Sequence, residues 1–392
     1  MTLISVATAT QLLKTHWPDW GTTEVSLDYP LPAPLQEAIV TDRPYPPGDR
    51  VMMDGIALNA QAYQGGQRRF PVVGTVAAGD PLQSLPDPQG CVEIMTGALL
   101  PPDCDLVIPY EDIQITDGVA QVIVERERPP YEFVHRQGSD RGAGETVLHG
   151  NEALNGPRWG ILASVGKTTV IVRRSPKIEI ITTGDELVAV PEQPQPHQLR
   201  RSNSYALQAS LLKAGYQEIT ITHLPDDPIA IADHYQRAVT QYDLLIYSGG
   251  VSQGKFDYLP TIWQEQGVTQ YFHGVAQRPG KPLWFGVDQD HNTAILGLPG
   301  NPISSLVCLH RYVIEQPVQY AQLTADVTFA PPLTYFLPVK LTHTAAATLT
   351  AEPMSVQNSG AFLGLAHTSG FVELPATQST FNAGDCFRCF VW

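Results

Sequence analysis

The stretch from Asp243 to Pro260 reads DLLIYSGGVSQGKFDYLP, and it decides the fold class of the chain. Residues 243–248 form an apolar run that ends at a glycine turn, which is typical of a strand buried in a sheet. Gly249 and Gly250 then turn the chain, and Asp257 stands where a helix is expected to begin. A buried strand that leads through glycines into a helix indicates an α/β unit.

The same alternation of strand and helix continues on both sides of this stretch. Strands are expected at 177–183, 218–224, 243–248 and, with its turn, 292–300; helices are expected at 202–215, 227–242, 257–266 and 302–315. The second of these helices has Asp227 at its N-cap and Pro228 at N1. Alternating strands and helices predict a parallel sheet that is covered on both faces.

The rest of the chain has a different pattern. Short apolar or alternating runs separated by Gly, Pro and Asp predict β-structure between about 42 and 134 and again between about 330 and 392. Residues 5–17 and 151–165 have helical periodicity. Because 392 residues exceed the size of one ordinary core, we predict a multidomain protein in which an α/β domain is joined to two β-rich regions.

Composition and charge limit the classes of partner. With 24 basic and 39 acidic residues the formal net charge is −15, which disfavours nucleic acid and anionic membrane surfaces. The sequence contains neither a signal-peptide pattern nor an apolar stretch long enough to span a bilayer. Five cysteines, an odd number, favour a reducing compartment, and we expect a cytoplasmic protein. Cys386 and Cys389 form a lone C-x-x-C that is interpreted as part of a strand.

Carboxylates and glycine turns follow the predicted strands. In an open parallel sheet, ligands bind beyond the carboxyl ends of the strands. Those positions carry the acids Asp185, Glu186, Asp226, Asp227 and Asp257 and the neighbouring residues Ser248, Ser252 and Lys255. Backbone N–H groups in such turns bind phosphate oxygens, and carboxylates hold Mg²⁺. The pattern predicts a site for a phosphorylated ligand with a divalent cation, although each element alone also fits an ordinary cap or turn.

Several familiar motifs are absent. Gly166 and Lys167 would need a glycine at position 161 to form a Walker A loop, and that residue is Ile161. The sequence has no G-x-G-x-x-G after a strand, no paired histidines with zinc spacing and no G-x-S-x-G elbow. The turn RPGKP, residues 278–282, places Arg278 and Lys281 beside each other, either as a solvated turn or as a cationic clamp for an oxyanion.

Several stretches together resemble one family, the molybdopterin molybdenumtransferases (the MoeA family), whose animal relatives include the gephyrin C-terminal domain. The stretches are MMDGIAL (52–58), VEIMTGALLP (92–101), TTGDEL (182–187), NSYAL (203–207), PDD (225–227), SGGVSQGKFDY (248–258), RPGKP (278–282) and LPGNP (298–302). They follow the family's order and cover most of the chain. The most specific combination is TTGDEL with SGGVS-x-G-x-x-D and LPGNP.

The resemblance implies a reaction, a cofactor and partners. Adenylylated molybdopterin and molybdate would be converted into molybdenum cofactor and AMP with Mg²⁺ or a similar cation. The protein would be a homodimer, and a molybdopterin adenylyltransferase is a candidate partner. The resemblance also implies four domains: a split first domain at 1–41 and 135–172, a β-rich second domain at 42–134, the α/β molybdopterin-binding domain at 173–325 and a barrel-like C-terminal domain at 326–392.

The strand ends and the resemblance together give the candidate site residues. The expected catalytic residues are Asp54, Glu186, Asp226 and Asp257, and Glu186 and Asp257 are also the expected metal ligands. The expected substrate-binding residues are Thr96, Gly97, Thr183, Gly184, Asp185, Ser248, Gly249, Gly250, Ser252, Arg278, Lys281, Pro299 and Pro302. The resemblance implies that Asp54 and Thr96, from the MDG and MTG loops, complete the cleft opposite the carboxylates of the sheet edge.

The chain departs from the family pattern at a few positions. Val51 stands where a serine is usual, Ser139 precedes Asp140 where an acid is typical, and Arg278 replaces the first lysine of the KPGKP-like turn. The Gly-Arg usual in the N-terminal dimer segment is missing from LQEAIVTD (35–42). A non-catalytic molybdopterin-binding or scaffold protein of the same fold therefore remains an alternative, as does a different nucleotide-dependent enzyme that uses the same sheet edge.

Overall fold

The structure is a computed structural model of the 392-residue chain, and it describes all residues except 1, 30–32, 253–256 and 356–357. Lys255, which the sequence places in the glycine-rich loop, lies outside the described residues. The chain divides into two compact units. The first unit contains residues 1–22 and 173–392, and the second contains residues 23–172.

The first unit is built around a six-stranded sheet with the order β16-β13-β17-β21-β20-β18. Its strands are β13 (Ile178–Thr183), β16 (Ile219–Leu224), β17 (Leu244–Ser248), β18 (Thr269–His273), β20 (Trp284–Asp288) and β21 (Thr293–Leu298). The four strands from β16 to β21 are parallel, whereas β20 pairs antiparallel with β21, and β18 pairs antiparallel with β20. The parallel core agrees with the prediction, and the antiparallel edge is an addition to it.

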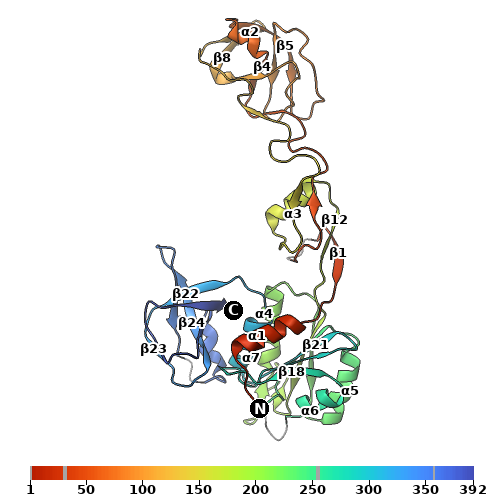
Figure 1. The fold of residues 1–392 in the computed structure, drawn as a ribbon, viewed down its shortest axis with the longest axis vertical. Coiled ribbons are helices and arrows are strands. Elements are labelled where there is room, and N and C mark those ends of the chain that lie inside the picture. Colours follow the sequence, from red (N-terminus) through yellow and green to blue (C-terminus); the bar gives the residue numbers. More distant parts are fainter. Residues whose placement is uncertain (1, 30–32, 253–256, 356–357) are drawn as a thin grey trace. The chain divides into compact units, whose positions relative to one another are not determined.

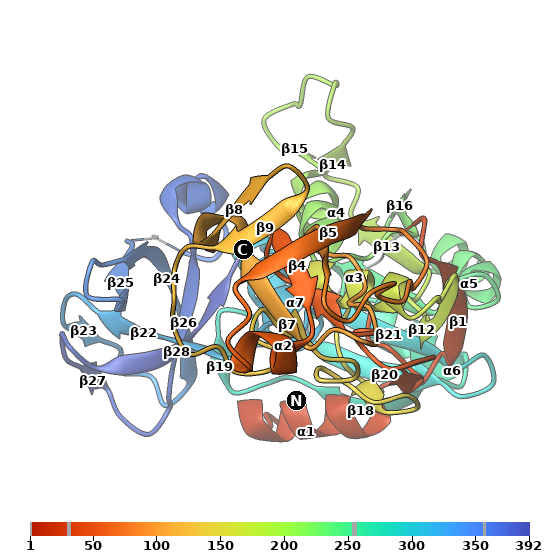
Figure 2. The same cartoon turned by 90° about the horizontal axis from the view of Figure 1, so that it is seen from above.

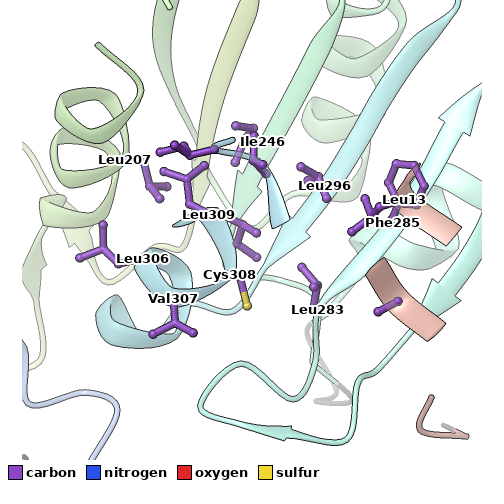
Figure 3. Packing of buried hydrophobic residues seen from close by; sticks show 14 of the residues in the cluster. Leu13, Leu207, Ile246, Leu283, Phe285, Leu296, Leu306, Val307, Cys308 and Leu309 are labelled. Carbon is purple, nitrogen blue, oxygen red and sulfur yellow. The ribbon is translucent and has the colours of Figure 1, made fainter. Parts of the chain in front are cut away.

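Helices cover both faces of this sheet, because its central strands are apolar on both sides. One face packs on α1 (Val6–His16), α4 (Ser202–Lys213) and α7 (Pro302–Tyr312); the other packs on α5 (Pro228–Ala238) and α6 (Leu259–Glu265) (Figure 1). Figure 3 shows the first layer, in which Leu309 of α7, Leu207 of α4 and Phe285 of β20 belong to one buried cluster. Burial of these side chains is the main source of stability for the unit.

A second sheet in this unit is formed by the C-terminal residues. Its order is β19-β24-β25-β22-β28-β26, and an additional β24–β26 pairing closes the last five of these strands into a barrel. The strands are β19 (Gln277–Arg278), β22 (Gln319–Leu323), β24 (Thr334–His343), β25 (Leu349–Pro353), β26 (Gly370–Leu374) and β28 (Cys386–Val391), with β23 (Val327–Thr328) paired to β27 (Thr380–Phe381) and a short helix η2 (Phe362–His367) nearby. Cys386 and Cys389 lie on β28 as unpaired cysteines, as their strand interpretation predicts.

A long arm leaves the α/β sheet after β13. It contains the short parallel strands β14 (Leu187–Val188) and β15 (Leu199–Arg200), and the segment between them projects away from the unit in Figure 2. The arm returns the chain to the start of α4. Its base therefore adjoins the sequence TTGDEL, in which several candidate site residues lie.

The second unit has a small and a larger part. In the small part β1 (Thr22–Ser26) pairs with β12 (Thr169–Arg173), β2 (Ile39–Val40) pairs with β11 (Thr146–Leu148), and α3 (Gly156–Ser164) completes an apolar cluster. The larger part is a six-stranded sheet with the order β7-β4-β6-β5-β9-β8. Its elements are β3 (Arg50–Val51, paired with β10), β4 (Gly55–Leu58), α2 (Ala60–Gln64), β5 (Arg69–Val76), β6 (Cys91–Ile94), β7 (Leu106–Pro109), η1 (Tyr110–Asp112), β8 (Ile113–Thr116), β9 (Val119–Val122) and β10 (Val134–His135).

The architecture confirms a multidomain α/β protein with β-rich regions before and after the α/β sheet. The division into four domains stays a prediction. Helix α1, which the prediction assigns to the first domain, packs in the apolar core of the α/β unit. Among the described residues, no helix is both long and apolar enough to span a membrane.

We expect Phe285→Ala to destabilise the first unit by about 3–5 kcal/mol, because it deletes a fully buried ring and leaves a cavity. The measurement is urea unfolding followed by tryptophan fluorescence. Tyr205→Ala is the matched control, since Tyr205 is an exposed ring on α4 of the same unit and its loss should change the free energy of unfolding by about 0.5 kcal/mol or less. Equal effects of the two variants would contradict this account of the core.

Candidate functional site

Three loops meet at the carboxyl edge of the parallel strands. They follow β13 at Thr183, β17 at Ser248 and β21 at Leu298. The Gly249 amide donates to the Leu298 carbonyl at 3.1 Å, and a Cβ atom added to Gly249 would lie 3.2 Å from the Thr183 carbonyl oxygen. The loops that carry TTG, SGG and LPG are therefore in contact, as the order of the strands predicts.

The Gly249–Gly250 turn requires glycine for its backbone conformation. The φ angles are +105° at Gly249 and +66° at Gly250, in a region that L side chains rarely adopt. A Cβ at Gly250 would also lie 3.1 Å from Thr183 Oγ1 and 3.0 Å from Leu259 Cδ1. The turn thus presents bare backbone at the sheet edge, which is the property that a phosphate-binding loop needs.

Asn203 holds two of these loops together. Its amide Nδ2 donates to Ser248 Oγ at 2.9 Å and to the Gly300 carbonyl at 2.7 Å. Ser305, on α7, adds a hydrogen bond to the Pro299 carbonyl, and its hydroxyl lies 3.4 Å from Ser248 Oγ. Neither Asn203 nor Ser305 is among the predicted site residues. The only sequence signal for Asn203 is its place at the start of a helix in NSYAL.

Acidic side chains gather on the loops after β13 and β16. The Asp226 amide donates to Asp185 Oδ1 at 3.2 Å, which joins the two loops directly. Burial raises the pKa of the Asp226 carboxyl, and the negative charges of Asp185 and Asp257 raise it further. These three carboxylates therefore act on one another electrostatically. A site with this excess of negative charge favours a cation.

Glu186 lies in the same region. Its carboxylate packs against Gly184, where an added Cβ would be 2.5 Å from Glu186 Oε2. Both Asp185 and Glu186 are exposed, so a ligand can reach them. No group of three or more His, Cys, Asp and Glu side chains in the described part of the chain is arranged to hold a metal ion by itself. Mg²⁺ sites commonly use one or two carboxylates with water and substrate phosphates, and the acids of this edge fit that chemistry.

The RPGKP turn is fixed against α7. A Cβ at Gly280 would lie 2.6 Å from both Cys308 Sγ and Gln277 Nε2, so the turn needs glycine for close packing. Gln277 is fully buried and donates to the Gly280 carbonyl at 3.1 Å. Tyr312 in turn donates to Gln277 Oε1. These contacts hold Arg278 and Lys281 on a rigid turn while both side chains remain exposed.

Arg278 borders a pocket of about 190 Å³ within the first unit. Its guanidinium lies 6.0 Å from the ring of Phe329, which stacks on Tyr335 at 4.2 Å. The other lining residues are Pro279, Ile303, Phe336, Pro338, Asn358 and Ser359. The pocket therefore combines one cation with aromatic, amide and hydroxyl groups, a combination that suits a small oxyanion or a polar ring.

The second unit brings together the MDG and MTG sequences. Asp54 accepts hydrogen bonds from the Thr96 amide at 2.6 Å and from Thr96 Oγ1 at 2.7 Å. The backbone N–H and then the hydroxyl of Thr96 lower the pKa of the exposed Asp54 carboxyl and keep it ionised. Arg50 donates to the Gly97 carbonyl at 2.7 Å, and the Gly97 amide donates to the Val51 carbonyl at the same distance. Arg50 was not predicted.

Four further predicted residues lie on the loops that follow β17 and β21. Ser252 is exposed on the glycine-rich loop, and Asp257 is half-buried beside the start of α6. Pro299 is buried, and its carbonyl accepts the hydrogen bond from Ser305. Pro302 occupies the first turn of α7. The structure thus joins Thr183, Gly184, Asp185, Ser248, Gly249, Gly250 and Asp226 at one sheet edge. It joins Asp54, Thr96 and Gly97 within the second unit.

Comparison with protein families covers nearly the whole chain. Residues 4–166 match the MoeA N-terminal region (domain I and II), residues 179–318 match the probable molybdopterin binding domain, and residues 320–392 match the MoeA C-terminal region (domain IV). A molybdopterin molybdenumtransferase from Synechocystis is 55% identical over 390 residues, which is 100% of both chains. A molybdopterin molybdenumtransferase from Bacillus subtilis is 29% identical over 94% of this chain and 90% of its own.

Solved structures agree with the sequence relatives. A molybdopterin biosynthesis MoeA protein from Pyrococcus horikoshii superposes with a TM-score of 0.82 at 26% identity, covering 100% of this chain and 99% of its own. A second structure of a MoeA protein from that organism gives a TM-score of 0.83 at 22% identity over the full length of both chains.

We expect Thr96→Val to raise the pKa of Asp54, because it removes the hydroxyl donor that favours the ionised carboxylate. The rise should be partial, since the Thr96 amide still donates. Carboxyl-carbon NMR titration of aspartate-labelled protein measures the pKa, and Thr96→Ser, which retains a hydroxyl, is the control. An unchanged Asp54 pKa in Thr96→Val would show that the hydroxyl has no influence on the carboxylate.

Proposed function

The chain belongs to the molybdopterin molybdenumtransferase family, and we propose that it transfers molybdenum from molybdate to adenylylated molybdopterin with release of AMP. The observation that carries this proposal is the meeting of the TTG, SGG and LPG loops beside Asp185 and Asp226 at one sheet edge. Bare glycine backbone suits phosphate oxygens, and neighbouring carboxylates suit a divalent cation.

The reaction that we propose cleaves a phosphoanhydride, so the protein must position the reactants and neutralise charge. Backbone N–H groups of the Gly249–Gly250 turn would bind the phosphates of the adenylylated pterin. Asp257 and Glu186 would hold Mg²⁺, which when bound polarises the phosphoryl group. Asp226 lies in the same acidic group, and its raised pKa is consistent with a cation being needed there. Asp54, held ionised by Thr96, is a further proposed catalytic carboxylate.

Arg278 and Lys281 supply positive charge for the second substrate. Molybdate is an oxyanion, and charged donors on a rigid turn can orient it. The Arg278 pocket supports this role because it pairs the guanidinium with Asn358 and Ser359, which offer further hydrogen bonds. The buried contacts of Gln277 and Gly280 fix the turn, so that little ordering is required when the anion binds.

We further propose a homodimer that acts in the cytoplasm and receives its substrate from a molybdopterin adenylyltransferase. The free, unpaired state of all five cysteines is consistent with a reducing compartment. An adenylylated substrate requires an adenylyl-transferring enzyme upstream of this step. The rival proposal is a molybdopterin-binding scaffold without turnover, and Val51 was the sequence feature that favoured it.

Val51 has a structural explanation that weakens that rival. The side chain is buried in the apolar cluster of the second unit, and its backbone accepts from Gly97 and donates to Ala98. A serine hydroxyl is therefore not required to hold the MTG turn in place.

The proposed reaction is tested by molybdate-dependent release of AMP from adenylylated molybdopterin in the presence of Mg²⁺. We expect Asp257→Ala to reduce the rate by at least about 100-fold, because it removes a proposed ligand of the cation. Asp233→Ala is the control, since Asp233 is exposed on α5 and has no proposed role. Wild-type protein that binds the adenylylated pterin tightly but releases no AMP would favour the scaffold.

We expect Arg278→Met and Lys281→Met each to weaken molybdate binding by about tenfold or more, because a hydrogen bond to a charged group contributes about 1.5–3 kcal/mol. The difference from wild type should be largest at low salt and shrink as salt screens the charge. Calorimetric titration with molybdate measures the affinity. Lys340→Met, which removes an exposed cation from β24, is the control. Unchanged affinity in both turn variants would remove the RPGKP turn from the site.

A further inference from the structure

The carboxyl edge of the sheet carries an in-register row in which three of the four side chains are polar. On four neighbouring strands, the residues opposite one another are His223, Thr182, Ser248 and Leu298. The row two residues earlier, on the same face, is Ile221, Ile180, Ile246 and Leu296, and it belongs to the apolar core. The face therefore changes from apolar to polar within one strand repeat, at the point where the proposed ligand edge begins.

His223 is the outermost member of this row, because β16 is the edge strand of the sheet. Its Nδ1 lies 3.1 Å from the Thr182 carbonyl oxygen and 3.2 Å from Thr182 Oγ1. A carbonyl oxygen can only accept, so the contact requires a hydrogen on Nδ1. Thr182 Oγ1 has its own acceptor in the Thr222 carbonyl at 3.5 Å and is free to accept from the same N–H. The carbonyl contact therefore favours the tautomer of His223 that carries a hydrogen on Nδ1.

This contact joins β13 and β16, the two strands that lead into the loops carrying Asp185 and Asp226. Asp185 follows Thr182 by three residues, and Asp226 follows His223 by three residues. The two loops touch through the Asp226 amide and Asp185 Oδ1. The repulsion between Asp185, Asp226 and Asp257 acts to separate these loops, and the His223 charge, when present, opposes it at Asp226.

We propose that His223 is a positioning residue: its Nδ1–H ties the end of β16 to the end of β13 and thereby sets the spacing of Asp185 and Asp226. The proposal rests on the proposed molybdenum transfer at this edge. Asp226 is a proposed catalytic residue, and Asp185 adjoins the proposed cation ligand Glu186, so a shift of either loop would displace groups that act on the substrate. A misplacement of about 1 Å can cost about 100-fold in rate. The tie is local, so its loss should alter catalysis more than folding.

The test compares two substitutions of the histidine. Asparagine places an amide N–H where Nδ1 stands but carries no charge, whereas leucine supplies neither donor nor charge. We expect His223→Leu to lower kcat/KM for adenylylated molybdopterin about 10- to 100-fold and to raise the Mg²⁺ concentration needed for half-maximal rate. His223→Asn should recover to within about threefold of wild type. Thr220→Val, a change at an exposed position on the same strand, is the control and should behave as wild type.

Thermal unfolding of all variants accompanies the kinetics. Similar midpoints with different activity support positioning, while full activity of His223→Leu would overturn it. Equal loss in His223→Asn and His223→Leu would also overturn it, since the ring or its charge would then matter rather than the N–H donor.

A second measurement does not depend on the enzyme reaction. Nitrogen–proton correlation NMR of histidine-labelled protein reports which ring nitrogen of His223 carries the hydrogen, with His223→Asn used for assignment. A neutral ring protonated on Nδ1 supports the tie even if wild-type protein releases no AMP. A neutral ring protonated on Nε2 would overturn it whatever the activity. Failure of the tie and failure of the proposed reaction are therefore distinguishable.

Discussion

A strand that is buried on both faces of a parallel sheet carries mainly apolar side chains, and a polar side chain within it needs a hydrogen-bond partner. β13, β17 and β21 are largely apolar until Thr182 and Ser248, and the buried carboxylate of Glu179 on β13 accepts a hydrogen bond from Thr222 Oγ1. The glycines of the proposed phosphate-binding turn and the acids Asp185 and Asp226 follow within a few residues of the strand ends. The helices that cover the two faces also begin there, so Asn203 on α4 and Ser305 on α7 are placed to hydrogen-bond the same loops.

The candidate residues of the two units differ in their electrostatic character. At the sheet edge, burial and the negative charges of Asp185 and Asp257 raise the pKa of Asp226. In the second unit, Thr96 donates twice to Asp54 and favours its ionised form before any ligand is present. The surroundings of Asp226 therefore oppose its negative charge, whereas the hydrogen bonds from Thr96 favour that of Asp54.

Much of this arrangement could be predicted from the sequence. Apolar runs ending in glycine located β13, β17 and β21, and the spacing of the acids located the ligand edge. The antiparallel pairing of β18 and β20 was not predicted. In the described chain no helix lies between β18 and β21. Strands joined without a helix pair as antiparallel neighbours, whereas parallel neighbours need a longer crossover connection. Asn203 and Arg50 were not predicted because their carbonyl partners are distant in sequence, which no local pattern records. Ser305 was not predicted because its bond to the nearby Pro299 carbonyl depends on how the LPG turn folds back onto α7.

The buried thiol of Cys308 has a use of a different kind. It packs under Gly280, and burial raises its pKa to about 12, so in the folded protein the reactive thiolate is scarce and shielded. Alkylating reagents can therefore reach it only when the turn lifts from α7. The rate at which the Cys308 thiol is alkylated therefore measures how often the RPGKP turn opens. A bound oxyanion that holds the turn closed would lower this rate.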